Sequence, residues 1–286
     1  MNYALGTVQF GMKYGISNED DETSIEEVKS ILELCKRNKI DTLDTAINYG
    51  SSETKLGLAS VKDFKVVSKI PPIDCTIDDV SSLIKVKLLD SLKRLKIDKM
   101  YGILLHRSAD LQSNNKKEII TSLNNLKADG LVEKIGCSIY SPDELNFIFN
   151  SLDVDIIQAP LNLLDRRLID SGWLSKLKIN GVEIHSRSTF LQGLLLMSKQ
   201  DIPSSFNHSK KIFEKWFEFI NKNNISQLSA CLSFVRSINE IDKILIGVQN
   251  STQLMEIINT KTFDMKSLNT EFMNSKKLNL IDPSKW

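Results

Sequence analysis

The sequence contains few cysteines and lacks a long apolar run. Its four cysteines, Cys35, Cys75, Cys137 and Cys231, lie far apart and form no CxxC pair. This spacing fits free thiols in a reducing compartment better than a disulfide framework or a zinc site. The N-terminal residues MNYALGTVQFG lack the basic start and long apolar stretch of a secretory signal, and no segment approaches the roughly 20 apolar residues that span a bilayer. We therefore expect a cytoplasmic protein with no metal site.

The sequence also lacks an excess of one charge. Lys and Arg number 37 and Asp and Glu number 36, which gives a formal net charge of +1. Such a balance provides no general attraction to nucleic acid or to an anionic membrane, and we expect neither as a partner. Hydrophobic residues make up 41% of the chain and charged residues 26%, a globular composition that can bury a full core.

Short strand patterns alternate with helical patterns along the whole chain. The strands are expected at Ala4–Phe10, Thr42–Thr45, Lys65–Ile70, Tyr101–Leu105, Lys134–Ser138, Asp155–Gln158, Gly181–Ser186 and Lys243–Gly247. The helices are expected at about 24–38, 52–60, 76–95, 115–129, 142–150, 166–178, 208–223 and 251–259, with an extra one at Ser226–Ser237. Eight strand–helix units and no low-complexity linker predict an α/β protein, a single-domain (β/α)8 TIM barrel over residues 1–286.

An open, doubly wound sheet is the competing architecture. It usually carries a GxGxxG phosphate-binding turn after its first strand. Here the first strand is followed by Phe10-Gly11-Met12-Lys13-Tyr14-Gly15, which lacks that spacing. The barrel is therefore favoured. Helix starts are also marked, because Ser24-Ile25-Glu26-Glu27 has the pattern of a capping box.

Four chemically suitable residues fall at the ends of consecutive expected strands. Asp44 and Tyr49 follow the second strand, Lys69 lies at the third and His106 at the fourth. Taken singly, such a lysine is usually on the surface, and such a histidine or tyrosine usually serves packing. The carboxyl ends of barrel strands meet at one face, however, so these four side chains can converge there.

Together the four residues suit the reduction of a carbonyl group. This reaction needs a hydride donor and an acid that protonates the developing alkoxide. We assign the proton to Tyr49 and expect the Lys69 cation to lower its pKa, with Asp44 pairing the lysine and His106 orienting the substrate.

The segments around these residues resemble the aldo-keto reductase family. The run from Ile40 to Glu53, IDTLDTAINYGSSE, is similar to the family signature, and Val66–Lys69 and Ile103–His106 are similar to its lysine and histidine strands. The resemblance extends from Leu5-Gly6-Thr7 to about Glu256. It implies a (β/α)8 barrel, NADPH-preferring carbonyl reduction and no metal.

The resemblance also implies a set of cofactor contacts. Ser138 and Gln158 match contacts to the nicotinamide carboxamide, and Ser186–Leu195 matches a pyrophosphate loop. Arg187 replaces the ring that usually stacks on the nicotinamide; stacking by its guanidinium and an ion pair with Asp or Glu are equal alternatives. The residues expected to contact the cofactor are Gly6, Thr7, Ser138, Gln158, Arg187, Gln192, Gly193, Leu194, Gly247, Gln253 and Glu256.

The last strand and helix resemble the adenosine-binding end, with Glu256 at the adenine contact. Asn250 is expected to cap the helix and to leave backbone amides for a phosphate. Gly247 and Gln253 stand where many family members have Lys and Arg for the 2′-phosphate, and their absence weakens the preference for NADPH. NADH is therefore a second possible cofactor.

For the remaining histidines and for the loop after the first strand, structural roles are expected. We expect His185 to be a core residue or to support the cofactor loop from behind, and His208 to begin a surface helix. Lys13 and Tyr14 are expected in a solvated turn, with contact to the substrate as the alternative. The expected partner is a small carbonyl substrate, with a sugar-derived carbonyl as one candidate, and the expected state is a monomer or weak oligomer. A catalytically silent nucleotide- or partner-binding barrel is the alternative function, and an isomerase or lyase is a third.

Overall fold

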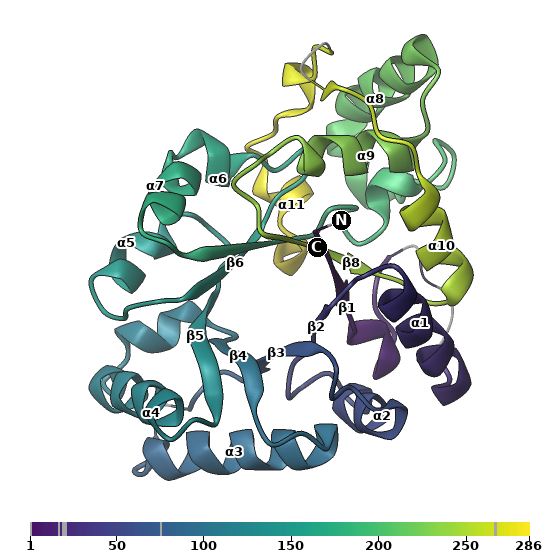
Figure 1. Cartoon of the computed structure of the whole chain (residues 1–286). Helices are drawn as coiled ribbons and strands as arrows, with labels where there is room; N and C mark the ends of the chain where they lie inside the picture. Colours follow the sequence, from purple (N-terminus) through teal and green to yellow (C-terminus); the bar gives the residue numbers. More distant parts are fainter. Residues whose placement is uncertain (1, 17, 19–21, 75, 266–267) are drawn as a thin grey trace.

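Eight parallel strands close into a barrel, with helices around its outside (Figure 1). The computed structural model describes residues 2–16, 18, 22–74, 76–265 and 268–286. The strands are β1 (Tyr3–Gly6), β2 (Thr42–Asp44), β3 (Lys65–Ile70), β4 (Met100–Leu105), β5 (Val132–Ser138), β6 (Ile156–Pro160), β7 (Glu183–Arg187) and β8 (Lys243–Gly247). Strand β1 pairs with both β2 and β8, which completes the ring. The predicted (β/α)8 barrel is confirmed.

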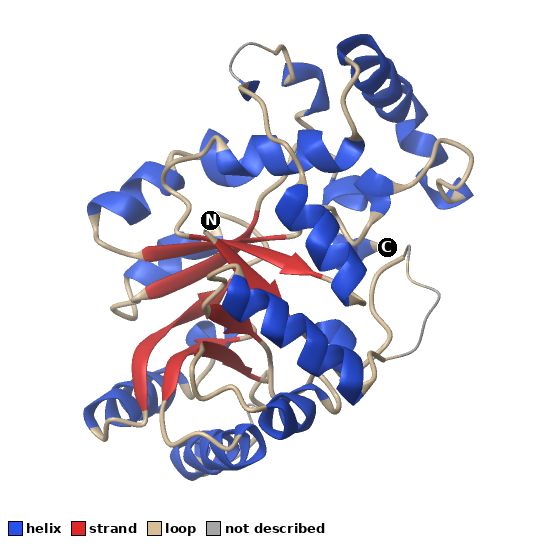
Figure 2. Cartoon of the chain, turned by 45° about the vertical axis from the view of Figure 1, so that its right-hand side comes forward, coloured by secondary structure: helices blue, strands red, loops and turns tan. Residues whose placement is uncertain are grey.

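The helices form an outer layer over the strands (Figure 2). They are α1 (Ile25–Arg37), α2 (Ser52–Ala59), α3 (Val80–Leu95), α4 (Lys116–Ala128), α5 (Glu144–Phe149), α6 (Arg167–Asp170), α7 (Trp173–Ile179), α8 (Lys210–Asn223), α9 (Gln227–Arg236), α10 (Ser251–Asn259) and α11 (Leu278–Ile281). Their apolar faces pack on the outer faces of the strands and form the main core. The extra helix that the sequence suggests before the last strand is α9.

The amino-terminal half of the barrel interior is filled by side chains that have structural partners. Val67, Leu104 and Ile156 form a small apolar layer. Beyond it, the Glu183 carboxylate accepts hydrogen bonds from Tyr101 Oη at 2.7 Å and pairs with His185 Nε2 at 2.8 Å. The buried His185 is thus a core residue, as expected, and this end of the barrel serves stability.

Several observed elements differ from the sequence expectations, and three of the differences have a clear local cause. Strand β1 ends at Gly6, and Val8–Phe10 forms a short 3-10 helix, because the Thr7 backbone and side chain both bond to the carbonyl of Asp44. The helix expected at 166–178 is two helices, separated at Gly172, whose φ of 75° is left-handed. The helix expected from residue 76 begins at Val80, after the capping side chain of Asp79.

The chain after α10 contains short helical segments that the sequence patterns did not suggest. It runs back over the barrel beside α8 (Figure 1). There the Arg166 guanidinium bonds to the Thr270 carbonyl at 2.7 Å, and the Ser275 amide bonds to the Leu164 carbonyl at 2.8 Å. This segment therefore fixes the loop that follows β6.

The cysteines and helices agree with the bulk expectations as far as the structure describes them. Cys35, Cys137 and Cys231 are buried free thiols, and Cys75 lies outside the described residues. Within the described ranges, the helices are all too short or too polar to cross a membrane.

Candidate active site

A cavity of about 590 Å³ opens at the carboxyl ends of the strands. Asp44, Tyr49 and Gln158 line one part of it, and Arg187 lies beside them. The lining continues over the ends of β1 and β8 to helices α9 and α10. Its volume is that of a site for a sizeable organic ligand rather than for a single ion. Within the described part of the chain, no group of three or more His, Cys, Asp or Glu side chains is arranged to hold a metal ion.

Asp44 and Lys69 form a buried ion pair beneath this cavity. Lys69 Nζ lies 2.6 Å from Asp44 Oδ2 and donates a second hydrogen bond, of 2.8 Å, to the carbonyl of Thr45. The other carboxylate oxygen, Oδ1, accepts from Gln158 Nε2 at 2.6 Å. Burial lowers the pKa of Lys69, and the Asp44 carboxylate opposes that shift. Both groups are therefore held in fixed positions by neighbours on three strands.

Tyr49 is brought to the same place by two glycines. A Cβ on Gly11 would lie 1.9 Å from the carbonyl oxygen of Tyr49, and a Cβ on Gly50 would lie 2.1 Å from the carbonyl oxygen of Gly11. The loops after β1 and β2 therefore touch only because both residues lack side chains. The resulting position puts Lys69 Nζ 5.2 Å from the centre of the Tyr49 ring.

The expected lowering of the Tyr49 pKa is wrong. Burial is the largest influence and raises the pKa, the Asp44 carboxylate raises it further, and Arg187 acts in the opposite direction. Lys69 has little influence because its ammonium group is already paired with Asp44 and the Thr45 carbonyl. Tyr49 is accordingly a fully protonated phenol at neutral pH.

The ring of His106 packs against the ring of Tyr49. The two rings meet edge to face, with centroids 5.9 Å apart. Burial, followed by the positive charge of Lys69, lowers the pKa of His106 to about 4. Its buried Nδ1 has no hydrogen-bond partner among the described residues. The imidazole is thus neutral at physiological pH.

The cavity unites nine of the eleven residues expected to contact a cofactor. Ser138 and Leu194 do not line it: Ser138 is buried, with Oγ 3.5 Å from Gln158 Oε1, and Leu194 is part of the core. The nine lining residues are Gly6, Thr7, Gln158, Arg187, Gln192, Gly193, Gly247, Gln253 and Glu256.

Arg187 is held by neutral groups. Its Nη2 donates to the Ile139 carbonyl at 2.9 Å, its Nη1 lies 3.3 Å from Ser188 Oγ, and its guanidinium stacks 4.6 Å from the centre of the Tyr140 ring. Among the described residues it forms none of the ion pairs with Asp or Glu that were one alternative. The cation therefore remains uncompensated beside Tyr49.

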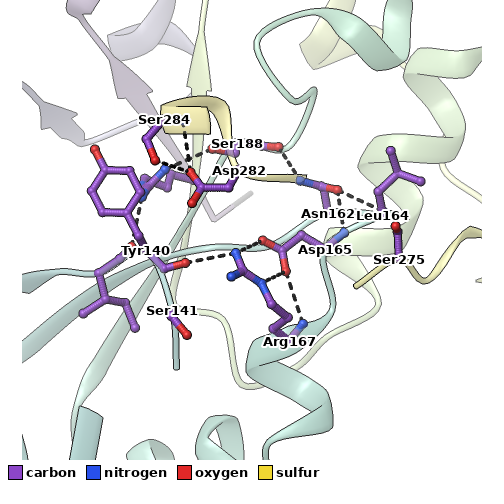
Figure 3. Close-up of polar contacts among 12 residues, drawn as sticks. Tyr140, Ser141, Asn162, Leu164, Asp165, Arg167, Ser188, Ser275, Asp282 and Ser284 are labelled. Carbon is purple, nitrogen blue, oxygen red and sulfur yellow. Dashed lines mark hydrogen bonds and ion pairs between the residues drawn. The ribbon is translucent and has the colours of Figure 1, made fainter. Parts of the chain in front are cut away.

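Residues that sequence reasoning did not select support the cavity walls. Asn162 Nδ2 donates to the Ser188 carbonyl at 2.9 Å and fixes the loop after β7, while its Oδ1 accepts from the amides of Leu164 and Asp165 (Figure 3). Gln227 of α9 donates to two carbonyls of the same wall, those of Leu195 and Met197. An asparagine that bonds to amides two and three positions ahead is a recognisable turn signal in the sequence, but its long-range partner is not.

Backbone amides at the start of α10 are largely engaged. Asn250 caps the helix as expected, its Oδ1 accepting from the Gln253 amide at 2.9 Å. The Gln253 side chain accepts from the Gln249 amide at 2.7 Å, and the carboxylate of Glu27 accepts from the Ser251 amide. Few amides are therefore left for a phosphate, in contrast to the expectation.

The cavity nevertheless fits a dinucleotide. Gly6 and Gly247 lie in its wall, Gln158 supplies an amide beside Asp44, and the lining extends from Tyr49 to Glu256 of α10. Tyr49 lies at one end, with His106 and Lys69 packed against it outside the lining, and the rest of the cavity provides room for an extended molecule.

Comparisons with known proteins agree with this geometry. The chain matches the Aldo/keto reductase family over residues 3–275. It is 22% identical over 281 residues to the NADH-specific methylglyoxal reductase of Escherichia coli strain K12, covering 86% of each chain. The holo form of the aldo-keto reductase AKR11C1 from Bacillus halodurans superposes with a TM-score of 0.75 at 18% identity, covering 95% of this chain and 90% of that one. The glycerol dehydrogenase AKR11B4 from Gluconobacter oxydans gives a TM-score of 0.69 at 20% identity, with 95% and 88% covered. The chain belongs to the aldo/keto reductase family.

Proposed function

We propose that this protein reduces a small aldehyde or ketone with a nicotinamide dinucleotide, and that Tyr49 donates the proton. The observation that carries the proposal is the position of Tyr49 in the wall of the cavity, with Lys69 Nζ 5.2 Å from its ring centre and His106 against its edge. The arrangement supplies an acid, a polar group for the substrate and space for a large cofactor.

When bound, the nicotinamide supplies the hydride. The raised pKa of Tyr49 keeps its proton in place until negative charge develops on the substrate oxygen, to which Oη then transfers it. The phenolate that remains is stabilised by the nearby Arg187 guanidinium, the group that acts to lower the pKa of Tyr49.

The other two residues orient the reactants. His106, neutral above a pH of about 4, offers a ring nitrogen to the carbonyl oxygen without adding charge. Asp44 keeps Lys69 charged and fixed, and Gln158 holds Asp44 through its second oxygen. Asp44 is thus a positioning residue, because it holds the Lys69 ammonium and the Gln158 amide in place.

The relatives' names guide the choice of substrates. One is called a methylglyoxal reductase and another a glycerol dehydrogenase. Suitable probes for this cavity are therefore methylglyoxal, glyceraldehyde, dihydroxyacetone and larger sugar aldehydes.

The test is the consumption of NADH and of NADPH with this panel, followed by the absorbance of the reduced nicotinamide. Tyr49→Phe is expected to reduce kcat by about 10²- to 10⁴-fold while the affinity for dinucleotide is retained. Tyr14→Phe is the control, since Tyr14 lines the cavity but is 40% exposed, and we expect it to keep most of the activity.

Two outcomes would overturn the proposal. Tight dinucleotide binding without turnover of any carbonyl would indicate a silent nucleotide-binding barrel. Conversion of a substrate without a change in nicotinamide absorbance would indicate an isomerase or a lyase.

A further inference from the structure

The end of the cavity opposite Tyr49 bears on the preference between NADH and NADPH. This inference rests on the proposed function. Tyr49 follows β2, whereas the opposite end of the lining consists of Gly247, Val248, Gln249, Gln253 and Glu256, from β8 and α10. Strand β1 lies between them. A dinucleotide that places its reacting ring at Tyr49 must therefore extend its second nucleotide towards α10. NADPH differs from NADH there, by a phosphate on the adenosine ribose.

The described residues that line this end of the cavity include no cationic side chain. Among the described lining residues, Arg187 at the catalytic end is the sole Lys or Arg, and Glu256 places a carboxylate at the far end. Gly247 offers no side chain, and a Cβ there would lie 2.6 Å from Nε2 of Gln9. Phosphates are bound by charge-assisted hydrogen bonds, for which this surface has no cationic donor.

The helix terminus does not compensate for the missing cations. The amide of Ser251 donates to the Glu27 carboxylate, that of Gln249 to the Gln253 side chain, and that of Gln253 to Asn250. These amides are the ones that would otherwise attract an anion to the start of α10. One of their acceptors, Glu27, is itself an anion.

Glu27 reaches this position from a different helix. It lies at the third position of α1, where a capping box would turn its carboxylate back to Ser24; the Ser24 side chain does accept from the Glu27 amide, at 3.2 Å. Its carboxylate instead bonds across to Ser251, because α1 and α10 pack side by side (Figure 1). A negative charge from the first helix is thereby placed at the start of the last helix of the barrel.

We propose that Glu27 selects NADH over NADPH by placing a carboxylate at the start of α10. A carboxylate beside a ribose site accepts hydrogen bonds from hydroxyl groups, and it repels a phosphate at the same place. Glu27 lies outside the cavity lining, but its carboxylate at the start of α10 adds to the charge of Glu256 in the lining, so discrimination arises from electrostatic repulsion of the phosphorylated form.

The test uses ADP-ribose and 2′-phospho-ADP-ribose, which lack the nicotinamide, with the dissociation constants measured by calorimetry. The wild-type protein is expected to bind ADP-ribose at least about tenfold more tightly. In Glu27→Gln the side-chain oxygen can still accept from Ser251, so the fold is retained while the charge is lost. This change is expected to reduce the discrimination by about three- to tenfold.

Glu26→Gln is the matched control, because Glu26 is the preceding residue on α1, is exposed and carries the same charge. It is expected to leave the ratio of the two dissociation constants unchanged. Gln253→Arg, which adds a cation at the cavity rim, is expected to raise the affinity for 2′-phospho-ADP-ribose selectively. Raising the ionic strength should weaken the discrimination of the wild type more than that of E27Q.

Equal binding of the two ligands by the wild type, or equal ratios in E27Q and E26Q, would overturn the role of Glu27 and leave the proposed reduction intact. Binding of neither ligand would mean that the cavity is not a dinucleotide site, and would overturn the proposed function with it.

Discussion

The ammonium group of Lys69 lies 2.6 Å from Oδ2 of Asp44, and the two side chains are only 1% and 5% exposed. Neither charge can be hydrated, so each depends on the other and on the neighbouring hydrogen bonds. The pair therefore connects the stability of the barrel to the geometry of its proposed site.

Replacing Lys69 with Met is expected to lower the free energy of unfolding by about 3–5 kcal/mol, because it leaves a buried carboxylate without its cation. Urea unfolding measures this change. Lys36→Met is the control: Lys36 pairs with Asp63 at 3.1 Å, but these side chains are 36% and 77% exposed, and the expected loss is below about 1 kcal/mol. Similar losses in both variants would refute the role of burial.

His106 should make stability depend on pH. Its folded pKa of about 4 lies below the usual 6.5, so between these values the unfolded chain binds more protons. The contribution of His106 to the free energy of unfolding is constant above about pH 6.5. It is lost as the pH falls towards about 4. His106→Gln is expected to show a shallower decline in this window, whereas His208→Gln, which removes an exposed imidazole, keeps the wild-type slope. Titration of the His106 ring by NMR gives the pKa directly, and a value near the usual one would contradict this prediction.

Glu53 connects α2, β3 and α3 through four hydrogen bonds. Its Oε1 accepts from Ser68 at 2.7 Å and Ser91 at 2.6 Å, and its Oε2 from Arg94 at 2.9 and 2.6 Å. An amide cannot satisfy the guanidinium in the same way, so Glu53→Gln is expected to cost about 2–4 kcal/mol in unfolding free energy. The exposed Glu33→Gln serves as the comparison, and an equal effect would show that the cluster is not stabilising.

The contact between Gly11 and Gly50 should control the position of Tyr49. Gly11→Ala or Gly50→Ala forces the two loops apart, since the new methyl groups would lie about 2 Å from backbone oxygens. We expect kcat to fall roughly 10- to 100-fold, because small displacements of a reacting group are costly. Gly130→Ala is the control: its φ is +73°, but nothing lies within 4 Å of its added methyl group, so it costs about 1–2 kcal/mol of stability and leaves kcat unchanged. Equal kcat in all these variants would refute the positioning role.

The alternation of strand and helix patterns was sufficient to predict the barrel, and strand ends were sufficient to select Asp44, Tyr49, Lys69 and His106. The direction of the Tyr49 pKa shift was not predictable, because it is set mainly by the burial of the side chain in the folded protein. Helices α6 and α7 were joined in the prediction because their apolar periodicity continues across Gly172, whose left-handed φ is a property of the folded turn. The hydrogen bond from the Ser251 amide to the Glu27 carboxylate joins residues 224 positions apart, so no local sequence pattern predicts it.

That same contact exists only in a closed barrel. Ser251 follows β8, which completes the ring by pairing with β1, and Glu27 follows β1. A chain still emerging from the ribosome holds the acidic group long before its partner helix has been made. The selection that we propose for Glu27 therefore requires the closed barrel, and a measurement of ligand preference during refolding would report when the barrel closes.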